Sequence, residues 1–376
     1  MSAVVIDTAS NCRPWRAVDL AADTSWTMHL TAEEVAGFEV ALEHAKRSGK
    51  ALLDMTAEDF PLTEAARSLL DRAMAKTQKD FGVSLVKGFP VHRWSEADSR
   101  LAYWGMGLHM GLARPQNRSS EVIADVRDEG GGYPIKNIRG YTTNARLDFH
   151  MDSCDVVGLL CRRTAKSGGT SMILSSIALR DEVVKRRPDL LATLQQPFLH
   201  SYQNSQDPTQ PPYYRCSIIS NDPSIFALRT NRKNTQAVEI DFEDAPRLSS
   251  RQIEALDLLD QIMLEPGFAY SMPLEMGDMQ LLNNYVTLHS RTQYEDHQDP
   301  DQKRHLLRLW LAVPYSQPLP QDWEEYYGDV RAGVVRGGLR GSAITPQFLA
   351  FEKRQAESLG MPLRPWRPLV RREANS

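Results

Sequence analysis

Residues 147–155, LDFHMDSCD, bring three aspartates and one histidine together beside apolar residues. His150 and Asp152 are two positions apart, and alternate residues of a strand point to the same side. Such an H-x-D pair can offer one nitrogen and one oxygen to a single ion. Iron(II) is commonly held by two histidines and one carboxylate, which leave other positions open. The pair therefore predicts a metal site that needs a distant histidine to complete it.

The spacing alone does not decide which carboxylate takes part. Asp148 also lies two residues from His150, and Asp155 is close behind. An H-x-D motif by itself is a weak signal, because it occurs by chance in many proteins. A turn at the end of a strand is the simpler explanation of this segment unless other residues support a metal.

The third ligand must come from the other histidines, of which the chain has nine in all. His289 is the first candidate, because it ends the apolar run LLNNYVTLH after a tight turn. His200 is the second candidate, because it ends the apolar stretch QPFLH. His297 and His305 lie in polar sequence, and we expect both to be solvated.

The N-terminal elements expected around these residues are helices. Thr31 and Glu34 form a capping-box pattern that begins a helix ending near Gly49. A second helix is expected over residues 63–82, which makes residues 1–82 a helical N-terminal part.

From residue 83 the periodicity changes to that of short strands. Apolar or β-branched runs predict strands at 83–90, 155–161 and 306–314, and a Gly-Asp turn within 275–284 leads into another. Helical spacing returns from residue 95, at about 176–195 and at about 250–265. This mixture favours a β-sandwich or barrel core over residues 83–315, with helical insertions and flanking helices. Residues 316–376 are expected to be an extension packed on the core of a single domain.

Composition limits the classes of partner. Hydrophobic residues are 41% and charged residues 24% of the chain, both normal for a globular protein. The net charge of −4 gives no electrostatic reason to expect nucleic acid or an anionic membrane. The four cysteines are far apart, so no disulfide framework or structural zinc cluster is expected. Without a signal-like start or a long apolar run, we expect a cytoplasmic protein with a small-molecule substrate. A homo-oligomer is compatible with this composition.

Two stretches of the chain resemble a known enzyme family. NARLDFHMDSCDVVGLLCRRTAKSGGTSMILSS is followed much later by MGDMQLLNNYVTLHSRTQYEDHQDPDQKRHLLRLWL. The order of the H-x-D, the Gly-Gly-Thr, the distal histidine and two arginines resembles the iron(II)/2-oxoglutarate-dependent dioxygenases of the TauD/TfdA family, over roughly residues 80–315. The resemblance implies an α+β, mainly β fold with a double-stranded β-helix (jelly-roll) core. It also implies that His150, Asp152 and His289 are the iron ligands.

The resemblance further implies the reaction and its co-substrates. Dioxygenases of this kind use O2 and 2-oxoglutarate. They couple the decarboxylation of 2-oxoglutarate to succinate and CO2 with the oxidation of a substrate C–H bond. Because Asp152 is present, hydroxylation, desaturation or cyclisation is implied rather than halogenation, for which relatives usually replace the carboxylate by Gly or Ala.

Arginines are expected to bind the carboxylates of the reactants, because a planar guanidinium can bind a carboxylate through two hydrogen bonds. Arg304, fifteen residues after His289, matches the family arginine that pairs with 2-oxoglutarate. Thr170, in SGGTS, matches a hydroxyl that hydrogen-bonds the same molecule. Arg308 lies four residues after Arg304 and matches an arginine that in several relatives binds an anionic group of the main substrate. Arg308 thus suggests a carboxylate-bearing metabolite or an amino acid.

Three further residues are weaker candidates for contact with the substrate. Asn144 and Arg146 precede the H-x-D, where solvated turn residues are an equally good interpretation. Arg336 lies in the Gly-rich segment RAGVVRGGLRGS, which lacks the strand-to-helix context of a phosphate-binding loop.

Two other classes of protein compete with the dioxygenase. A zinc hydrolase with a His-Asp-His site is one, but the chain has no H-E-x-x-H motif and a hydrolase has no need of Arg304. A non-catalytic jelly-roll binding protein is the other, and it predicts degenerate ligands, whereas all three are present.

Overall fold

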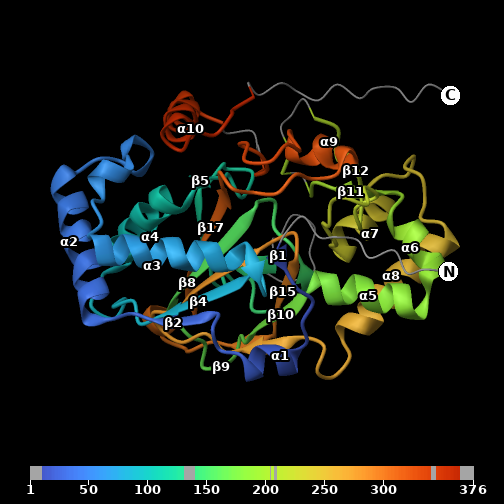
Figure 1. Ribbon diagram of the computed structural model, residues 1–376, viewed down its shortest axis with the longest axis horizontal. Helices are drawn as coiled ribbons and strands as arrows, with labels where there is room; N and C mark the ends of the chain where they lie inside the picture. The colour runs from blue at the N-terminus through green and yellow to red at the C-terminus, as the bar shows by residue number, and fades with distance from the viewer. Residues whose placement is uncertain (1–10, 131–139, 204, 207–209, 340–343, 365–376) are drawn as a thin grey trace.

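Two sheets form the centre of the computed structural model, which describes residues 11–130, 140–203, 205–206, 210–339 and 344–364 (Figure 1). The larger sheet has seven strands: β2 (Thr27–His29), β4 (Val83–Lys87), β14 (Met279–Asn283), β8 (Val156–Arg163), β17 (His305–Ala312) and β5 (Leu112–Ala113) in that order, with β6 (Ile123–Val126) also paired to β17. The smaller sheet has the order β13 (Tyr270–Met272), β10 (Ser171–Ser175), β15 (Thr287–Arg291) and β7 (Leu147–His150). All pairings in the two sheets are antiparallel except that of β2 with β4.

Apolar side chains from both sheets meet in one core. Val157 of β8 and Trp310 of β17 pack with Ile173 of β10 and Leu288 of β15, and all four are almost fully buried. Val156, the neighbour of Val157, points the other way into the core beneath the N-terminal helices. Because β8 is buried on both faces, its sequence is a continuous apolar run rather than an alternating one.

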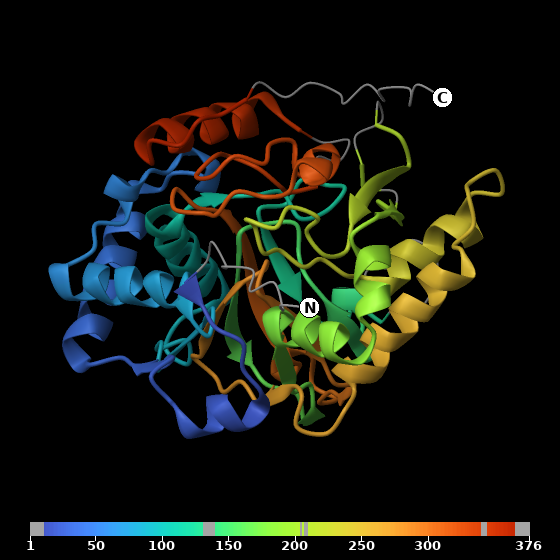
Figure 2. The same ribbon diagram turned by 45° about the vertical axis from the view of Figure 1, so that its right-hand side comes forward.

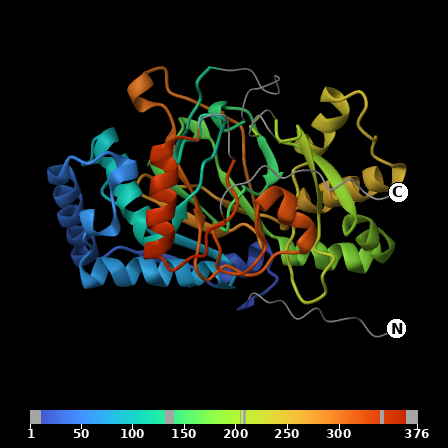
Figure 3. The same ribbon diagram turned by 90° about the horizontal axis from the view of Figure 1, so that it is seen from above.

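Three N-terminal helices cover the outer face of the larger sheet (Figures 1 and 3). They are α2 (Ala32–Ser48), α3 (Glu64–Thr77) and α4 (Glu96–Met110). The predicted capping box of Thr31 and Glu34 is present, and Gly49 ends α2 in the left-handed conformation. The second helix ends before the predicted Gly82, because β3 (Lys79–Asp80) pairs with β1 (Asn11–Cys12). Residues 11–82 are therefore not wholly helical, and they also supply the short helix α1 (Ala17–Ala22) and the edge strand β2.

A long insertion between β10 and β13 forms the other end of the molecule, which comes forward in Figure 2. It contains α5 (Ser176–Arg186), α6 (Pro188–Leu194), β11 (Pro197–Ser201), β12 (Tyr213–Ser217), α7 (Arg232–Asp241) and α8 (Ser250–Met263). Pro188 divides the helix predicted over 176–195 into α5 and α6, because proline cannot donate the backbone hydrogen bond of a helix interior. The hairpin of β11 with β12 and the helix α7 were not predicted from the sequence.

The C-terminal segment returns over the core and contains two helices, α9 (Glu324–Tyr327) and α10 (Pro346–Ser358), seen at the top of Figure 1. Residues 340–343 and 365–376 of the predicted extension lie outside the described residues. The remaining short strands β9 (Ser167–Gly168) and β16 (Tyr294–Glu295) pair with each other beside the smaller sheet. Within the described ranges, no helix is both long and apolar enough to cross a membrane.

Candidate active site

The H-x-D histidine and the distal histidine lie on neighbouring strands of the smaller sheet. His150 ends β7 and His289 lies within β15, and the two residues are direct partners in the antiparallel register. Their ring centroids are 4.4 Å apart. Side chains of directly opposed residues share one face of a sheet and lie close together. Strand pairing therefore brings the two imidazoles to one point.

Asp152 completes this group from the loop after β7. Its carboxylate is buried and lies 3.6 Å from Nε2 of His289. The side chain of Asn284 holds the loop, because its carbonyl accepts from the Asp152 amide and its amide donates to the Cys154 carbonyl. Donor atoms of His150, Asp152 and His289 all lie within 4.8 Å of one another.

The donor set fits a divalent metal ion. Nδ1 of His150 lies 2.8 Å from the backbone carbonyl of Asp148. A neutral imidazole in this position donates from Nδ1, which leaves the Nε2 lone pair for a metal. The 3.6 Å between His289 and Asp152 is longer than a hydrogen bond, as expected for groups that share an ion rather than a proton.

Electrostatics keep both kinds of ligand in the form that binds metal. Burial lowers the pKa of His289 to about 3, so its imidazole is neutral at neutral pH. Burial alone would raise the pKa of Asp152, but the positive charge of Arg308, together with His289 and His150, holds it below its ordinary value. The carboxylate is therefore ionised at neutral pH.

The two other aspartates of LDFHMDSCD differ from Asp152. Asp148 has an exposed side chain and contributes its backbone carbonyl to His150. Asp155 is buried, and its carboxylate accepts from Tyr285 at 2.6 Å, from Arg336 at 2.7 Å and from a backbone amide. Neither carboxylate belongs to the group formed by the histidines.

Two cavities meet at this group, and His150 and Arg308 line both. The larger encloses about 850 Å³ and the smaller about 490 Å³, with the solvent-filled space at their mouths included. The walls of the larger cavity include Tyr141, Asp148, Ser153, Ser201, Tyr202, Gln203, Arg229, Asn231, Lys233, Asn234, Trp310 and Tyr326. The walls of the smaller cavity include Val126, Leu159, Ser171, Leu274, His289, Arg291, Arg304 and Leu306.

Arg304 is a buried cation in the smaller cavity. Its Nη1 is buried and has no hydrogen-bond partner among the described residues, and its guanidinium lies 5.1 Å from the ring centre of Tyr294. Gly169 allows this packing, because a Cβ at that position would lie 3.0 Å from Nε of Arg304 and its φ is +68°. Thr170 is not among the lining residues, although its neighbour Ser171 is. The Thr170 backbone is tied to Thr292 by two hydrogen bonds.

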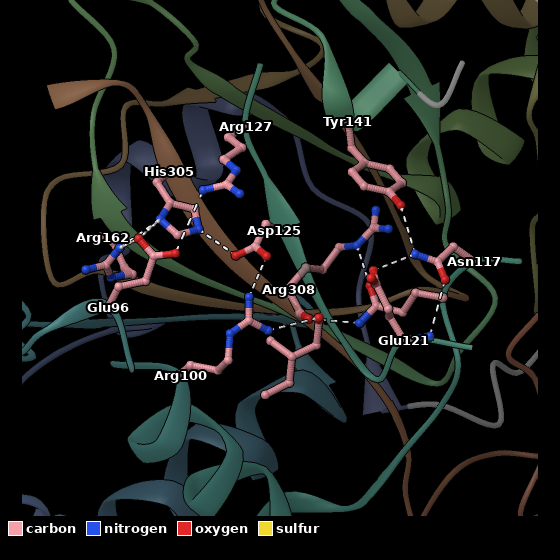
Figure 4. A network of polar contacts seen from close by, with 12 residues as sticks. Glu96, Arg100, Asn117, Glu121, Asp125, Arg127, Tyr141, Arg162, His305 and Arg308 are labelled. Atoms are coloured by element: carbon pink, nitrogen blue, oxygen red, sulfur yellow. Dashed lines mark hydrogen bonds and ion pairs between the residues drawn. The ribbon is translucent and has the colours of Figure 1, made fainter. Parts of the chain in front are cut away.

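Arg308 stands between the cavities with part of its donors already used (Figure 4). Nε donates to the side chain of Gln116 at 2.7 Å, and Nη1 lies 3.4 Å from Asp152. The guanidinium lies 4.6 Å from the ring centre of Tyr141 and 4.9 Å from that of Trp310. Nη2 is buried without a partner in the described part of the chain.

The structure does not bring every predicted residue to the cavities. Asn144 and Arg146 line neither cavity, and the Arg146 side chain is exposed. Arg336 also lines neither, because its three nitrogens bind Asp155 and the carbonyls of Arg331 and Gln317. These placements give no support to the predicted substrate contacts of the three residues.

The other candidate histidines also lie elsewhere. His200 is buried in the insertion, where it stacks on Tyr214 and contacts the Cys216 carbonyl and the Thr235 hydroxyl. It is not part of the ligand group. The prediction that His305 is solvated is wrong, because its side chain is fully buried.

His305 belongs to a separate ion-pair network that includes residues of the paired strands β6 and β17 (Figure 4). Its Nε2 lies 2.7 Å from Asp125, and its Nδ1 lies 2.8 Å from Arg162, which also pairs with Glu96. Arg100 pairs with Asp125 on the other side. Although Glu96, Asp125 and His305 have a spacing that could hold a metal, arginines already neutralise both carboxylates.

Several residues of the site carried no signal in the sequence. Gln116 and Arg229 are distant from the H-x-D along the chain, whereas Tyr141 precedes His150 by nine residues and Asn284 precedes His289 by five. None of the four belongs to a short chemical motif. They are found only when the strands and the insertion are assembled.

Comparison with known proteins identifies the family. The profile of the family described as "Taurine catabolism dioxygenase TauD, TfdA family" matches residues 46–310, well over half of the chain. The chain therefore belongs to this family and is a dioxygenase. The family's reaction uses iron(II), 2-oxoglutarate and O2.

Individual relatives agree with this family. FR-33289 synthase of Streptomyces rubellomurinus is 31% identical over 326 residues, which cover 85% of this chain and 95% of the relative. Uridine-5'-phosphate dioxygenase of an Amycolatopsis species is 26% identical over 205 residues, covering 51% of this chain and 69% of the relative.

Solved structures share the fold at low identity. An asparagine oxygenase in complex with Fe(II), 3-hydroxyasparagine and succinate superposes with a TM-score of 0.59 and 18% identity, covering 76% of this chain and 93% of that one. The non-heme iron oxygenase OrfP in complex with Fe and alpha-ketoglutaric acid superposes with a TM-score of 0.56 and 14% identity, covering 76% of this chain and 94% of that one. The arrangement of helices and sheets described above is thus that of non-heme iron oxygenases.

Proposed function

We propose that this dioxygenase oxidises, and more specifically hydroxylates, a C–H bond of a small acidic metabolite or amino acid, with release of succinate and CO2. The observation that carries the proposal is the meeting of His150, Asp152 and His289 at the junction of two cavities. We assign these three residues as the iron ligands and the two facing sheets as the family's double-stranded β-helix.

Each ligand has a defined role in this proposal. His289 offers a neutral imidazole nitrogen and Asp152 offers a negative charge. His150 offers Nε2 of a second imidazole, because its Nδ1 faces the Asp148 carbonyl. When bound, iron(II) supplies the activation of O2, which is driven by the oxidation of 2-oxoglutarate to succinate. Asp148 fixes the tautomer of His150 through its carbonyl.

The smaller cavity suits 2-oxoglutarate. The buried guanidinium of Arg304 can bind its distal carboxylate through two hydrogen bonds. Apolar side chains of Leu159, Leu274 and Leu306 line the same cavity and exclude water from that contact. Ionic hydrogen bonds gain strength where water is excluded.

The larger cavity then receives the main substrate. Its lining is rich in polar groups, which suits a small charged molecule rather than an apolar one. The names of the relatives agree with such substrates, since they mention asparagine and uridine 5'-phosphate. Arg308 has its Nη2 available toward an acidic group of the substrate.

The test is a screen for succinate formation by the purified protein with iron(II), 2-oxoglutarate and a panel of amino acids and small organic acids. We expect one iron per chain and turnover that depends on both additions. The variant His289→Ala should lose bound iron and turnover, whereas His200→Gln should keep both. Full activity of His289→Ala would refute the assigned ligand set.

A further inference from the structure

Arg229 is a buried arginine in the wall of the larger cavity, on the segment that follows β12. Only 4% of its surface is exposed. Its guanidinium lies 4.1 Å from the ring centre of Tyr326 and 5.0 Å from that of Tyr214, and Nη2 donates to the Tyr214 hydroxyl. It faces the same cavity as His150 and Asp152.

Arg229 is not paired with an acid among the described residues. Arg114 and Arg336 are as deeply buried, and they pair with Glu352 at 2.6 Å and with Asp155 at 2.7 Å. The groups around the Arg229 guanidinium are the rings of Tyr326 and Tyr214 and the Tyr214 hydroxyl rather than carboxylates. Nε and Nη1 are buried and have no hydrogen-bond partner within the described ranges. A buried charge without acceptors is unfavourable, so a bound molecule is expected to supply them.

The start of α7 adds positive potential beside Arg229. Asn231 caps this ten-residue helix, and Asn231, Lys233 and Asn234 all line the same cavity. The first N–H groups of a helix and its dipole favour an anion at this end. Apart from the proposed iron ligand Asp152, the only carboxylate that the described residues contribute to the lining is the exposed Asp148.

We propose that Arg229 and the N-terminus of α7 bind a phosphate or phosphonate group of the main substrate. A group with three anionic oxygens can accept from Arg229, from Lys233 and from helix N–H groups together. A carboxylate has two oxygens and one charge, which Arg229 alone would balance. The inference rests on the proposed function only in assuming that the bound anion belongs to the molecule that is oxidised. The binding of the anion itself does not depend on that function.

The experiment follows the 31P NMR signal of methylphosphonate with the full-length protein. The first measurement uses metal-free protein, so it does not depend on iron or on turnover. We expect line broadening that reports saturable binding to the wild type. Arg229→Gln should weaken this binding by at least about tenfold, which corresponds to about 1.4 kcal/mol. Arg229→Lys should restore part of it.

Matched controls separate recognition from folding. Arg232 provides a control, because it lies on α7 but its charge is paired with Asp257 and Asp260. Arg232→Gln should therefore leave methylphosphonate binding unchanged. If Arg229→Gln does not fold, Lys233→Gln gives a second test at the edge of the site, with an expected loss of at least about threefold. Equal binding of methylphosphonate by the wild type, Arg229→Gln and Lys233→Gln would overturn the proposal. The proposal would also be overturned if acetate or neutral acetamide bound to the site as tightly as methylphosphonate.

A second measurement distinguishes this proposal from the proposed function. Manganese(II) in place of iron should speed the 31P relaxation of bound methylphosphonate in the wild type, because the cavity also contains the ligand group. Binding that depends on Arg229 without any effect of manganese would support the anion site and contradict the assigned metal site. A manganese effect that is the same in Arg229→Gln would support the metal site and overturn the role of Arg229.

Discussion

The two aspartates on either side of His150 illustrate how surroundings decide the role of a residue. Asp148 is exposed to solvent, whereas Asp152 is buried beside Arg308 and two imidazoles. An exposed carboxylate keeps its hydration, but a buried one needs positive partners. A metal ion between Asp152 and the histidines would provide such a partner.

We therefore predict that Asp152→Asn abolishes stoichiometric iron(II) binding, whereas Asp148→Asn retains most of it. An amide has no negative charge, and only Asp152 lies within the ligand group. Anaerobic titration with iron(II) measures the affinity in each variant. Loss of iron from Asp148→Asn with retention in Asp152→Asn would show that Asp148, and not Asp152, is the carboxylate ligand.

Arg304, which immediately precedes β17, and Arg308, which lies within it, are expected to bind different ligands. Removing one partner of a buried charge pair costs about 2–5 kcal/mol. At about 1.4 kcal/mol per tenfold, Arg304→Gln should weaken 2-oxoglutarate binding by roughly thirtyfold to several-thousandfold. Arg308→Gln should leave 2-oxoglutarate binding nearly intact at saturating iron(II), because the Arg308 guanidinium is directed toward Gln116 and Asp152. The absorption band of 2-oxoglutarate bound to the metal, titrated without oxygen, measures both.

The opposite ranking would exchange the two assignments. If both substitutions weakened 2-oxoglutarate binding equally, Arg308 would also contribute to 2-oxoglutarate binding in the smaller cavity, which it lines together with Arg304.

At the scale of elements, short sequence patterns predicted those helices and strands whose formation depends mainly on neighbouring residues. The capping box and final glycine of α2 lie within the helix that they define, and the apolar run of β8 reflects burial on both faces. The pairing of His150 with His289 is different, because β7 and β15 are distant in sequence and their register depends on the assembled sheet.

The same reasoning explains what was missed. The β11–β12 hairpin, α7 and Arg229 lie in an insertion whose elements contact mainly one another. Its place beside the ligand group depends on the assembled fold and not on a local signal in the sequence. The proposed ligand residues could be named because a family motif marks them. The walls of the larger cavity could not, since no short motif connects Tyr141, Asn231 and Tyr326.

The turn before β10 gives a prediction at this scale. Gly169→Ala should destabilise the protein by about 1–2 kcal/mol, because an L-residue is strained at its φ of +68°. It should also weaken 2-oxoglutarate binding, because the added Cβ would meet Arg304. Gly49→Ala is the control, since Gly49 has a φ of +61° and a Cβ added there would meet nothing within 4 Å. Urea unfolding and the 2-oxoglutarate titration should show both effects in Gly169→Ala but only the first in Gly49→Ala.

At the scale of the whole molecule, the two ends of the chain support each other. Arg354 of α10 donates to the Leu53 carbonyl, and Gln347 donates to the side chain of Asp54. Arg114 follows β5 and forms a buried pair with Glu352 of α10. Figure 3 shows α10 beside the N-terminal helices, at the end of the molecule opposite the insertion. From these contacts we expect the single domain predicted from the sequence to unfold as one cooperative unit.

We predict that Glu352→Gln, which keeps the volume of the side chain, lowers the free energy of unfolding by about 3–5 kcal/mol. The reason is that it leaves the charge of Arg114 buried without its carboxylate. Glu324→Gln is the matched control, because its partner Arg364 is half exposed and such pairs contribute about 0–1 kcal/mol. Urea unfolding followed by tryptophan fluorescence and by circular dichroism should give one shared transition in both variants. If Glu352→Gln instead detached α10 in an early, separate transition while the main one stayed in place, the C-terminal segment would be an independent extension. The stability of the sheets would then not depend on it.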